Sequence, residues 1–361
     1  MRVAIAAGGT GGHIFPALAV ALEFRRWVPR VELFWIGTSR NREQELCDKN
    51  GIPLRILDVR GIRREISSEA VTALFSFARE IGDMKSFLRD NGIDAVVAFG
   101  GYVSAPVLAA ARMRSTPYFL QEQNTVPGLV NRLFAGGAAC TFLGFPLVHK
   151  RRLKGATRIT GTPVRRINGT YADFAYPAGF DKTQKTVLIS GGSQGADSMN
   201  RHLLEPAARL LEHDIQLVWQ TGAASCADVK SALAGFPNAF VMESVDDLYP
   251  YYAAASVVVC RAGASTINEV AYFGLPCVMI PLPWASENHQ WHNAGLVEGQ
   301  GRGVRIAQED GCGDEAVDAI LYMLSDRQSY ERMCRMALDN SPVNAAAQVV
   351  SGVLEGVKSR C

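Results

Sequence analysis

The sequence of 361 residues contains no run of apolar residues long enough to span a membrane. The start of the chain holds too short an apolar run for the core of a signal peptide. None of its eight cysteines forms a Cys-x-x-Cys pair, and Cys260 and Cys277 stand in apolar, strand-like runs. We therefore expect no membrane span and no disulfide framework, but buried, reduced thiols in a cytoplasmic protein.

Two familiar nucleotide-binding motifs are also missing. A dinucleotide-binding fingerprint needs Gly-x-Gly-x-x-Gly and a carboxylate at the end of the second strand. Counted from Gly9, the sixth position is Ile14, and the second strands of the two halves run into Thr38 and Thr221 without a carboxylate. No Gly-x-x-x-x-Gly-Lys-Ser/Thr sequence occurs either. The sequence thus excludes a P-loop nucleotide triphosphatase and argues against a dinucleotide-dependent oxidoreductase.

The net charge of +2 conceals an asymmetry between the two halves of the chain. Residues 1–168 carry 24 Lys and Arg against 13 Asp and Glu, whereas the remainder carries 13 against 22. The basic half predicts an anionic partner, such as nucleic acid, an acidic membrane face or a phosphorylated acceptor. The alternative is a chance segregation of charge on a solvated surface.

Two stretches half a chain apart are near copies of each other. Residues 3–12 and 187–195 each read as an apolar strand that runs into a glycine turn with a hydroxyl, and Ser193 corresponds to Thr10. A glycine turn between a strand and a helix lets backbone amides approach a phosphate or a sugar. The pair predicts two nucleotide-type α/β domains that face each other across a cleft.

The hydrophobic pattern predicts alternating strands and helices in both halves, hence parallel sheets covered on both faces. A first helix, with Pro16 in its first turn, should run to about Trp27. Breaks at 161–163 and 168–184 separate an N-terminal domain, 1–164, from a C-terminal domain, 165–342, and the helical segment 343–361 should pack back on the first. The expected strands are 2–7, 31–36, 54–58, 94–98, 117–120 and 139–142, then 186–190, 215–219, 238–242, 256–260 and 276–280.

His13 follows the first glycine turn, close to the start of the first helix. The positive potential of a helix N-terminus favours a neutral imidazole there, which can accept a proton near neutral pH. The alternative is a histidine that only caps the turn or packs against it. Five neighbouring residues of the glycine turn favour the functional interpretation.

Two segments of the second half could hold a nucleotide sugar. Thr266 and the turn amides near it stand where a diphosphate could bind a helix N-terminus, and Glu269 could accept both hydroxyls of a ribose. An ordinary surface glutamate is the alternative for that carboxylate. Gln290 and Asn293 stand one helical turn apart, as ligands of sugar hydroxyls would. His289 and His292 have metal-ligand spacing, but no third ligand is evident.

Taken together, these motifs resemble the MurG family of glycosyltransferases over nearly the whole chain. The resemblance rests on residues 8–19, 99–104, 122–124 and 191–196 and on the segment around Glu269, in the family's order and spacing. It implies a GT-B fold, with two Rossmann-like doubly wound domains facing each other across a cleft. The lipid acceptor would bind the N-terminal domain and the UDP-sugar the C-terminal domain.

The resemblance also implies roles for single residues. Glu269 would hold the ribose, the backbone of Val245 would contact the uracil, and Gln290 and Asn293 would face the donor sugar. Some family members carry Gln-Gln where this chain has His289-Gln290, so only Gln290 is transferred. The expected substrate-binding set is Thr10, Gly11, Gly12, Tyr102, Asn124, Arg165, Ser193, Val245, Ala264, Ser265, Thr266, Ile267, Asn268, Glu269, Gln290 and Asn293, with Ser193, Thr266 and Arg165 around the diphosphate and Asn124 reaching the donor sugar.

The implied reaction is an inverting transfer of GlcNAc from UDP-GlcNAc to the 4-hydroxyl of MurNAc in lipid I, with His13 as the general base and Glu122 as the second candidate. No cofactor is expected to bind tightly, no metal site is expected, and a divalent cation could assist without a protein site. The expected partners are UDP-GlcNAc, lipid I, the anionic cytoplasmic membrane face and other cell-wall synthesis proteins, but not nucleic acid. The alternatives are a GT-B transferase for another lipid or small-molecule acceptor, and a non-catalytic UDP-sugar-binding scaffold.

The helical stretch 70–89 predicts a peripheral membrane contact. One stripe at helical spacing is assigned to the core, namely Leu74, Phe77, Ile81, Met84 and Leu88. Phe75 falls on another face with Val71, beside Arg79 and Arg89, which is typical of a helix that lies against anionic lipid. Arg63, Arg64, Arg112 and Arg114 would widen the basic patch. The alternative is that Phe75 packs under a loop and the arginines are only solvated.

Overall fold

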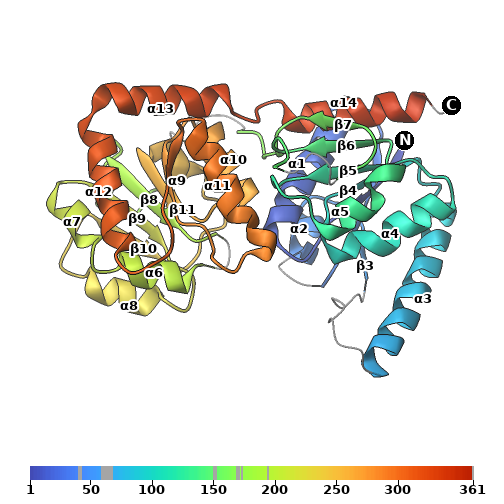
Figure 1. Ribbon diagram of the computed structural model, residues 1–361, viewed down its shortest axis with the longest axis horizontal. Coiled ribbons are helices and arrows are strands. Elements are labelled where there is room, and N and C mark those ends of the chain that lie inside the picture. The colour runs from blue at the N-terminus through green and yellow to red at the C-terminus, as the bar shows by residue number, and fades with distance from the viewer. Residues whose placement is uncertain are drawn as a thin grey trace. The chain divides into compact units, whose positions relative to one another are not determined.

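The computed structural model describes residues 1–39, 43–57, 68–148, 153–167, 171, 174–192 and 195–359, with the backbone alone for 68–75 (Figure 1). The chain divides into two compact units. Unit 1 contains Met1–Arg165 together with Pro342–Cys361, and unit 2 contains Arg166–Ser341. Each unit is built on one parallel sheet.

Unit 1 contains a seven-stranded sheet in the order β3-β2-β1-β4-β5-β6-β7. Its strands are β1 (Arg2–Ala6), β2 (Glu32–Gly37), β3 (Leu54–Ile56), β4 (Ala95–Ala98), β5 (Tyr118–Glu122), β6 (Cys140–Leu143) and β7 (Thr157–Ile159). Its helices are α1 (Gly11–Trp27), α2 (Glu43–Lys49), α3 (Ser68–Asp90), α4 (Gly101–Met113), α5 (Leu129–Phe134), the 3-10 turn η1 (Ala135–Gly137) and α14 (Ala345–Lys358). All six predicted strands are confirmed, and β7 is a short edge strand that was not predicted.

Both faces of this sheet are covered, which explains why its strands read as nearly continuous apolar runs. On one face Val3 and Ile5 of β1 pack with α1 and α14, and on the other Ala4 and Ala6 pack with α3 and α4. The C-terminal helix α14 lies directly on the sheet beside β6, because a Cβ at Gly352 would come within 2.6 Å of the ring of Phe142. The last helix therefore belongs to the core of unit 1.

Unit 2 repeats the arrangement with six parallel strands in the order β10-β9-β8-β11-β12-β13. They are β8 (Thr186–Ser190), β9 (Gln216–Gln220), β10 (Ala239–Met242), β11 (Val257–Cys260), β12 (Cys277–Met279) and β13 (Gly303–Arg305). Its helices are α6 (Asp197–Leu203), α7 (Ala208–Glu212), α8 (Cys226–Ala232), α9 (Tyr249–Ala254), α10 (Ala264–Tyr272), the 3-10 turn η3 (Ser286–Asn288), α11 (His289–Gly299), α12 (Cys312–Ser325) and α13 (Arg327–Asp339). The five predicted strands are confirmed, and β13 was not predicted.

In each unit the strand order reverses at one place. β1 pairs with β4 in unit 1, and β8 pairs with β11 in unit 2. The strands before this point in the sequence lie on one side of the pair, and the later strands lie on the other side. Ligands of doubly wound proteins bind at such a switch point, outside the carboxyl ends of the strands. The two glycine turns follow β1 and β8, so each lies at the switch point of its own sheet.

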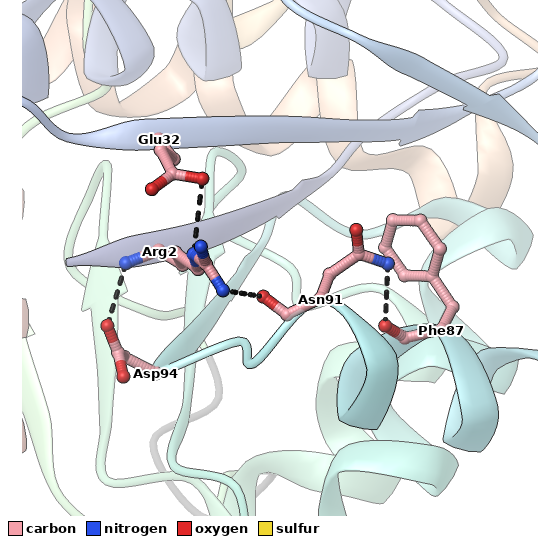
Figure 2. Close-up of polar contacts among 5 residues, drawn as sticks. All are labelled: Arg2, Glu32, Phe87, Asn91 and Asp94. Atoms are coloured by element: carbon pink, nitrogen blue, oxygen red, sulfur yellow. Dashed lines mark hydrogen bonds and ion pairs between the residues drawn. The ribbon is translucent and has the colours of Figure 1, made fainter.

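Arg2 connects the amino ends of the central strands of unit 1, at the end of the sheet away from the switch point, as Figure 2 shows. Its N–H donates to Asp94 at 2.7 Å, while its guanidinium contacts Glu32 at 3.1 Å and the carbonyl of Asn91 at 3.2 Å. These bonds join the amino ends of β1, β2 and β4 to the end of α3, where Asn91 also donates to the carbonyl of Phe87. The Arg2–Glu32 pair is exposed, so it contributes about 1 kcal/mol at most to the stability of the fold.

The thiols of unit 2 lie where the sequence suggests. Cys260 and Cys277 are buried on neighbouring strands β11 and β12, and both are free thiols. Burial raises the pKa of the Cys277 thiol to about 12. A thiol with such a pKa is almost entirely protonated at neutral pH, so it behaves as an apolar core residue rather than a nucleophile.

Candidate active site

The turn after β1 is shaped by glycine. Gly9 has a φ of +87°, in the left-handed region that favours glycine. A Cβ at Gly9 would lie 3.6 Å from the ring of Tyr102, so that ring covers the turn closely. Thr10 precedes the first residue of α1, and Gly11 and Gly12 form its first turn. Thr10, Gly11, Gly12 and Tyr102 thus lie together at the β1–β4 switch point.

His13 lies between the starts of two helices. Its Nδ1 is 3.3 Å from the carbonyl oxygen of Gly8 and 3.3 Å from the hydroxyl of Thr10. Its ring faces the start of α4, because a Cβ at Gly100 or Gly101 would come within 3.6 Å or 3.4 Å of it. The carbonyl oxygen of Gly8 can only accept, whereas the hydroxyl of Thr10 can donate or accept, so a neutral ring with its proton on Nδ1 satisfies both contacts. In that tautomer Nε2 is the nitrogen that can accept a proton.

Glu122 ends β5 inside unit 1 and is buried. Its Oε1 accepts the N–H and side-chain amide of Asn124 at 3.0 and 3.4 Å, and its Oε2 accepts Gly128 N–H at 2.9 Å and Asn131 Nδ2 at 2.8 Å. Burial raises the pKa of this carboxyl, and the four hydrogen bonds work against that rise. Glu122 therefore stabilises the loop that carries Asn124. Its partner Asn131 could not be identified from the sequence.

This environment predicts how Glu122→Gln changes stability with pH. Because burial raises the pKa of Glu122, its contribution to stability is complete below the ordinary pKa of glutamate and is lost as the pH rises through the raised value. Glutamine does not titrate, so the stability of the wild type relative to the variant should fall as the pH rises over that window. Urea unfolding of both chains at several pH values measures this difference, and parallel pH profiles would contradict it.

The start of α10 forms the second switch point, after β11. Ser265, Thr266 and Glu269 are half-buried, whereas Ile267 and Asn268 are each 2 % exposed. Asn268 donates to the carbonyl of Ala264 within its own helix, at 2.8 Å. Ala264, Ile267 and Asn268 can therefore reach a ligand only through their backbone, and Ser265, Thr266 and Glu269 are the side chains placed at the surface of this turn.

Arg261 holds the second switch point together. Its guanidinium donates to the carbonyls of Ile280 and Pro281 at 3.0 and 3.3 Å and to the hydroxyl of Ser198 at 2.9 Å. Burial lowers the pKa of Arg261 to about 10, which still leaves it charged at neutral pH. It joins the ends of β11 and β12 to α6, and the only sequence signal for it is an arginine directly after an apolar strand.

The loop before α11 adopts an unusual backbone. Glu287 and Asn288 both have positive φ, of 50° and 53°, which costs free energy in residues other than glycine and often marks a functional loop. Gln290 accepts the N–H of Leu282 at 2.9 Å through its Oε1. Asn293 is fully buried and donates to the carbonyl of Ala262 at 3.2 Å, so it supports the turn that leads into α10.

The other predicted residues are placed as follows. Ser193 lies outside the described residues, between Gly192 and Gly195, which both have positive φ. Val245 is half-buried in the loop between β10 and α9. Asn124 and Arg165 belong to unit 1, where Arg165 is its last residue before unit 2 begins.

Metal binding and membrane insertion have simple signatures in a structure. Across the described part of the chain, no three His, Cys, Asp or Glu side chains gather as metal ligands would. His289 uses its Nδ1 in a 2.8 Å contact with the carbonyl of Ser286. Among the helices in the described ranges, none is both long and apolar enough to cross a bilayer.

Comparison with known proteins gives matches to both units. Residues 3–143 match the N-terminal domain of glycosyltransferase family 28, and residues 186–349 match its C-terminal domain. The UDP-N-acetylglucosamine--N-acetylmuramyl-(pentapeptide) pyrophosphoryl-undecaprenol N-acetylglucosamine transferase of Chlorobaculum tepidum is 34% identical over 99% of this chain and 100% of its own length. The enzyme of that name from Bacillus subtilis is 31% identical over 99% and 100%.

Solved structures resemble the whole chain as well. The crystal structure of Acinetobacter baumannii MurG has a TM-score of 0.75 and 28% identity, and the match covers 98% of this chain and 99% of that one. A UDP-GlcNAc 2-epimerase from Neisseria meningitidis has a TM-score of 0.69 over 98% of this chain and 100% of its own. Its identity is only 14%, so that likeness concerns the fold alone.

Proposed function

Because this chain belongs to the MurG family within glycosyltransferase family 28, we propose that it transfers GlcNAc from UDP-GlcNAc to the MurNAc of lipid I. The observation that carries this proposal is the full-length likeness to curated relatives whose names state this transfer. The resemblance drawn from the sequence motifs and the predicted GT-B fold class are confirmed. A glycine turn follows the first strand of each sheet at its switch point, which supports the proposal.

We assign the donor to the β8–β11 switch point of unit 2. The start of α10 offers backbone N–H groups and the hydroxyl of Thr266 to a diphosphate, and the helix dipole favours negative charge there. Glu269, one turn further along the same helix, can accept both ribose hydroxyls. Gln290 can donate its amide N–H groups to a sugar hydroxyl while its oxygen holds Leu282. The backbone of Val245 would contact the uracil.

We assign the acceptor to the β1–β4 switch point of unit 1. Nε2 of His13 would remove the proton of the 4-hydroxyl of MurNAc as that oxygen attacks the anomeric carbon of the donor. The bond from this carbon to the diphosphate oxygen breaks, and its electron pair leaves with UDP. Attack opposite to the leaving group inverts the α-linked donor sugar to a β-1,4 linkage. Backbone N–H groups at the start of α10 would stabilise the charge that develops on UDP.

The remaining predicted roles stay predictions. Arg165 and Ser193 are proposed to lie around the diphosphate, and Asn124 is proposed to reach the donor sugar. A divalent cation could assist from solution, bound to the diphosphate rather than to protein ligands. Other cell-wall synthesis proteins are proposed as partners.

The proposed function is tested by offering alternative acceptors. Radiolabelled UDP-GlcNAc is incubated with the chain and either a short-chain lipid I analogue or a diacylglycerol. We expect labelled product only with the lipid I analogue. Transfer to the diacylglycerol alone would establish a transferase for another lipid, and binding of UDP without any transfer would establish a UDP-sugar-binding scaffold.

We further propose that the chain binds the cytoplasmic membrane face peripherally, through the outer side of α3. Arg63 and Arg64 and the side chains of Val71, Leu74 and Phe75 lie outside the described residues. In the predicted core stripe Met84 and Leu88 are buried, and Phe77 and Ile81 are half-buried. Arg79 and Arg89 are exposed. Arg112 and Met113, at the end of α4, are exposed too, which adds an apolar side chain beside a basic one.

The corresponding prediction concerns Phe75→Ser combined with Arg79→Glu. The double variant should sediment less with anionic vesicles and transfer more slowly to a long-chain lipid acceptor, because it loses an apolar anchor and reverses a charge. Transfer to a short-chain analogue should stay near the wild-type rate. Arg327→Glu is the matched control, since Arg327 also pairs with an acidic residue four positions later on an exposed helix face. Unchanged vesicle binding at low salt would exclude this face.

A further inference from the structure

A buried carboxylate lies behind the first glycine turn. Glu43 begins α2, and it is 1 % exposed. Its Oε1 accepts the N–H of Gly9 at 3.2 Å and the hydroxyl of Thr38 at 2.7 Å, and its Oε2 accepts the N–H of Thr38 at 2.9 Å. These bonds connect α2 to the ends of β1 and β2, which are neighbours in the sheet.

Two glycines leave room for the carboxylate of Glu43. A Cβ at Gly8 would lie 3.1 Å from Oε2, and a Cβ at Gly37 would collide with the same oxygen. The glycines at the ends of β1 and β2 therefore leave the space that the carboxylate fills. A buried carboxylate is costly unless it is hydrogen-bonded, and here three donors compensate it.

One peptide group links this carboxylate to His13. The N–H of Gly9, which donates to Glu43, and the carbonyl of Gly8, which contacts Nδ1 of His13 at 3.3 Å, belong to the same peptide bond. A peptide bond is planar, so fixing the direction of its N–H also fixes the direction of its carbonyl. Donation to a carboxylate also polarises the peptide and makes its carbonyl a better acceptor.

We propose that Glu43 is a positioning residue for His13. Through the Gly8–Gly9 peptide it holds the carbonyl that keeps the ring proton on Nδ1, which leaves Nε2 as the proton-accepting nitrogen. This role rests on the proposed function for its effect on transfer. The effect on the ring itself does not depend on that function.

The first experiment reads the ring directly, without substrates. Glu43→Gln keeps the size of the side chain, but in either orientation its amide N–H₂ faces an N–H donor, that of Gly9 or that of Thr38. With ¹⁵N-labelled histidine, the His13 resonances, assigned by their loss in His13→Ala, should show the Nδ1–H tautomer in the wild type. We expect a mixture of tautomers in Glu43→Gln. An unchanged tautomer would overturn the proposal.

The second experiment measures transfer to the short-chain lipid I analogue. Glu43→Gln should lower kcat about tenfold through lost orientation of the base, with KM for UDP-GlcNAc within about twofold of the wild type. In a His13→Ala background the same substitution should lower the residual kcat no further, because the group that it positions is gone. A further tenfold loss of kcat in that background would show that Glu43 acts independently of His13, as a purely structural residue would. A wild-type chain that transfers nothing would contradict the proposed function, while the tautomer measurement still decides the role of Glu43.

Glu23→Gln is the matched control. Glu23 is also a buried carboxylate of unit 1, 2 % exposed, and it accepts from Arg26 and Trp27 in the second half of α1. We expect it to lower the melting temperature without changing the His13 tautomer or kcat. If Glu43→Gln does not fold, Thr38→Val removes only the hydroxyl donor and should lower kcat about twofold to threefold. Unchanged kcat in Thr38→Val, or an equal loss in Glu23→Gln, would overturn the proposal.

Discussion

His13→Ala is expected to lower kcat about 100-fold or more, because it removes the group proposed to take the proton of the attacking hydroxyl. Alanine cannot accept a proton. The binding of UDP should be nearly unchanged, since the residues assigned to the nucleotide belong to unit 2, apart from Arg165 at the end of unit 1. Steady-state kinetics with the short-chain lipid I analogue gives kcat, and calorimetric titration gives the UDP affinity.

His213→Ala serves as the control, because His213 is an exposed histidine that follows α7. It should leave both quantities at their wild-type values. A His13→Ala chain that keeps most of its kcat would remove His13 from the mechanism and return Glu122 as the next candidate. A collapse of UDP affinity with kcat retained would move His13 to the donor side.

Glu269→Ala is expected to raise KM for UDP-GlcNAc by about 100-fold or more. Each hydrogen bond from a ribose hydroxyl to a carboxylate contributes roughly 1.5–3 kcal/mol, and the substitution removes both. KM for the acceptor should change far less. Steady-state kinetics with each substrate varied in turn separates the two effects, and a donor KM within about twofold of the wild type would contradict the assignment.

Glu315→Ala is the matched control for Glu269, because Glu315 is an exposed glutamate in the first turn of α12. Glu315 is thus an ordinary surface carboxylate, which is the alternative interpretation of Glu269 in the sequence analysis. UDP should raise the melting temperature of the wild type and of the Glu315 variant, but much less that of the Glu269 variant. NAD should raise none of them, since neither second strand ends in a carboxylate.

The fold was predictable because its strands are buried on both faces. Such strands read as short apolar runs, and the two glycine turns mark the places where they pass into helices. The strands that escaped prediction are β7 and β13, with three residues each. β7 is exposed throughout and carries no apolar run, and β13 contains a glycine and an arginine around a single valine.

The candidate site was predictable only where its residues follow one another in sequence. His13 adjoins its glycine turn, and Thr266 and Glu269 share one short helix, so local spacing was sufficient to place these residues at the starts of α1 and α10. Glu43 meets Gly9 from 34 positions away, and Arg261 meets Ser198 from 63 positions away. Asn293 was expected to face a sugar, but the structure buries its side chain against the carbonyl of Ala262. Such partners depend on tertiary contacts that no local pattern contains.

The most direct test of the central claim is the linkage in the product. UDP-GlcNAc and a short-chain lipid I analogue are incubated with the wild-type chain, and the purified product is examined by two-dimensional NMR. We expect one new sugar in the β configuration whose anomeric proton correlates with C4 of MurNAc. An α-linked sugar, a linkage to any other position, or free GlcNAc as the only product would contradict the account.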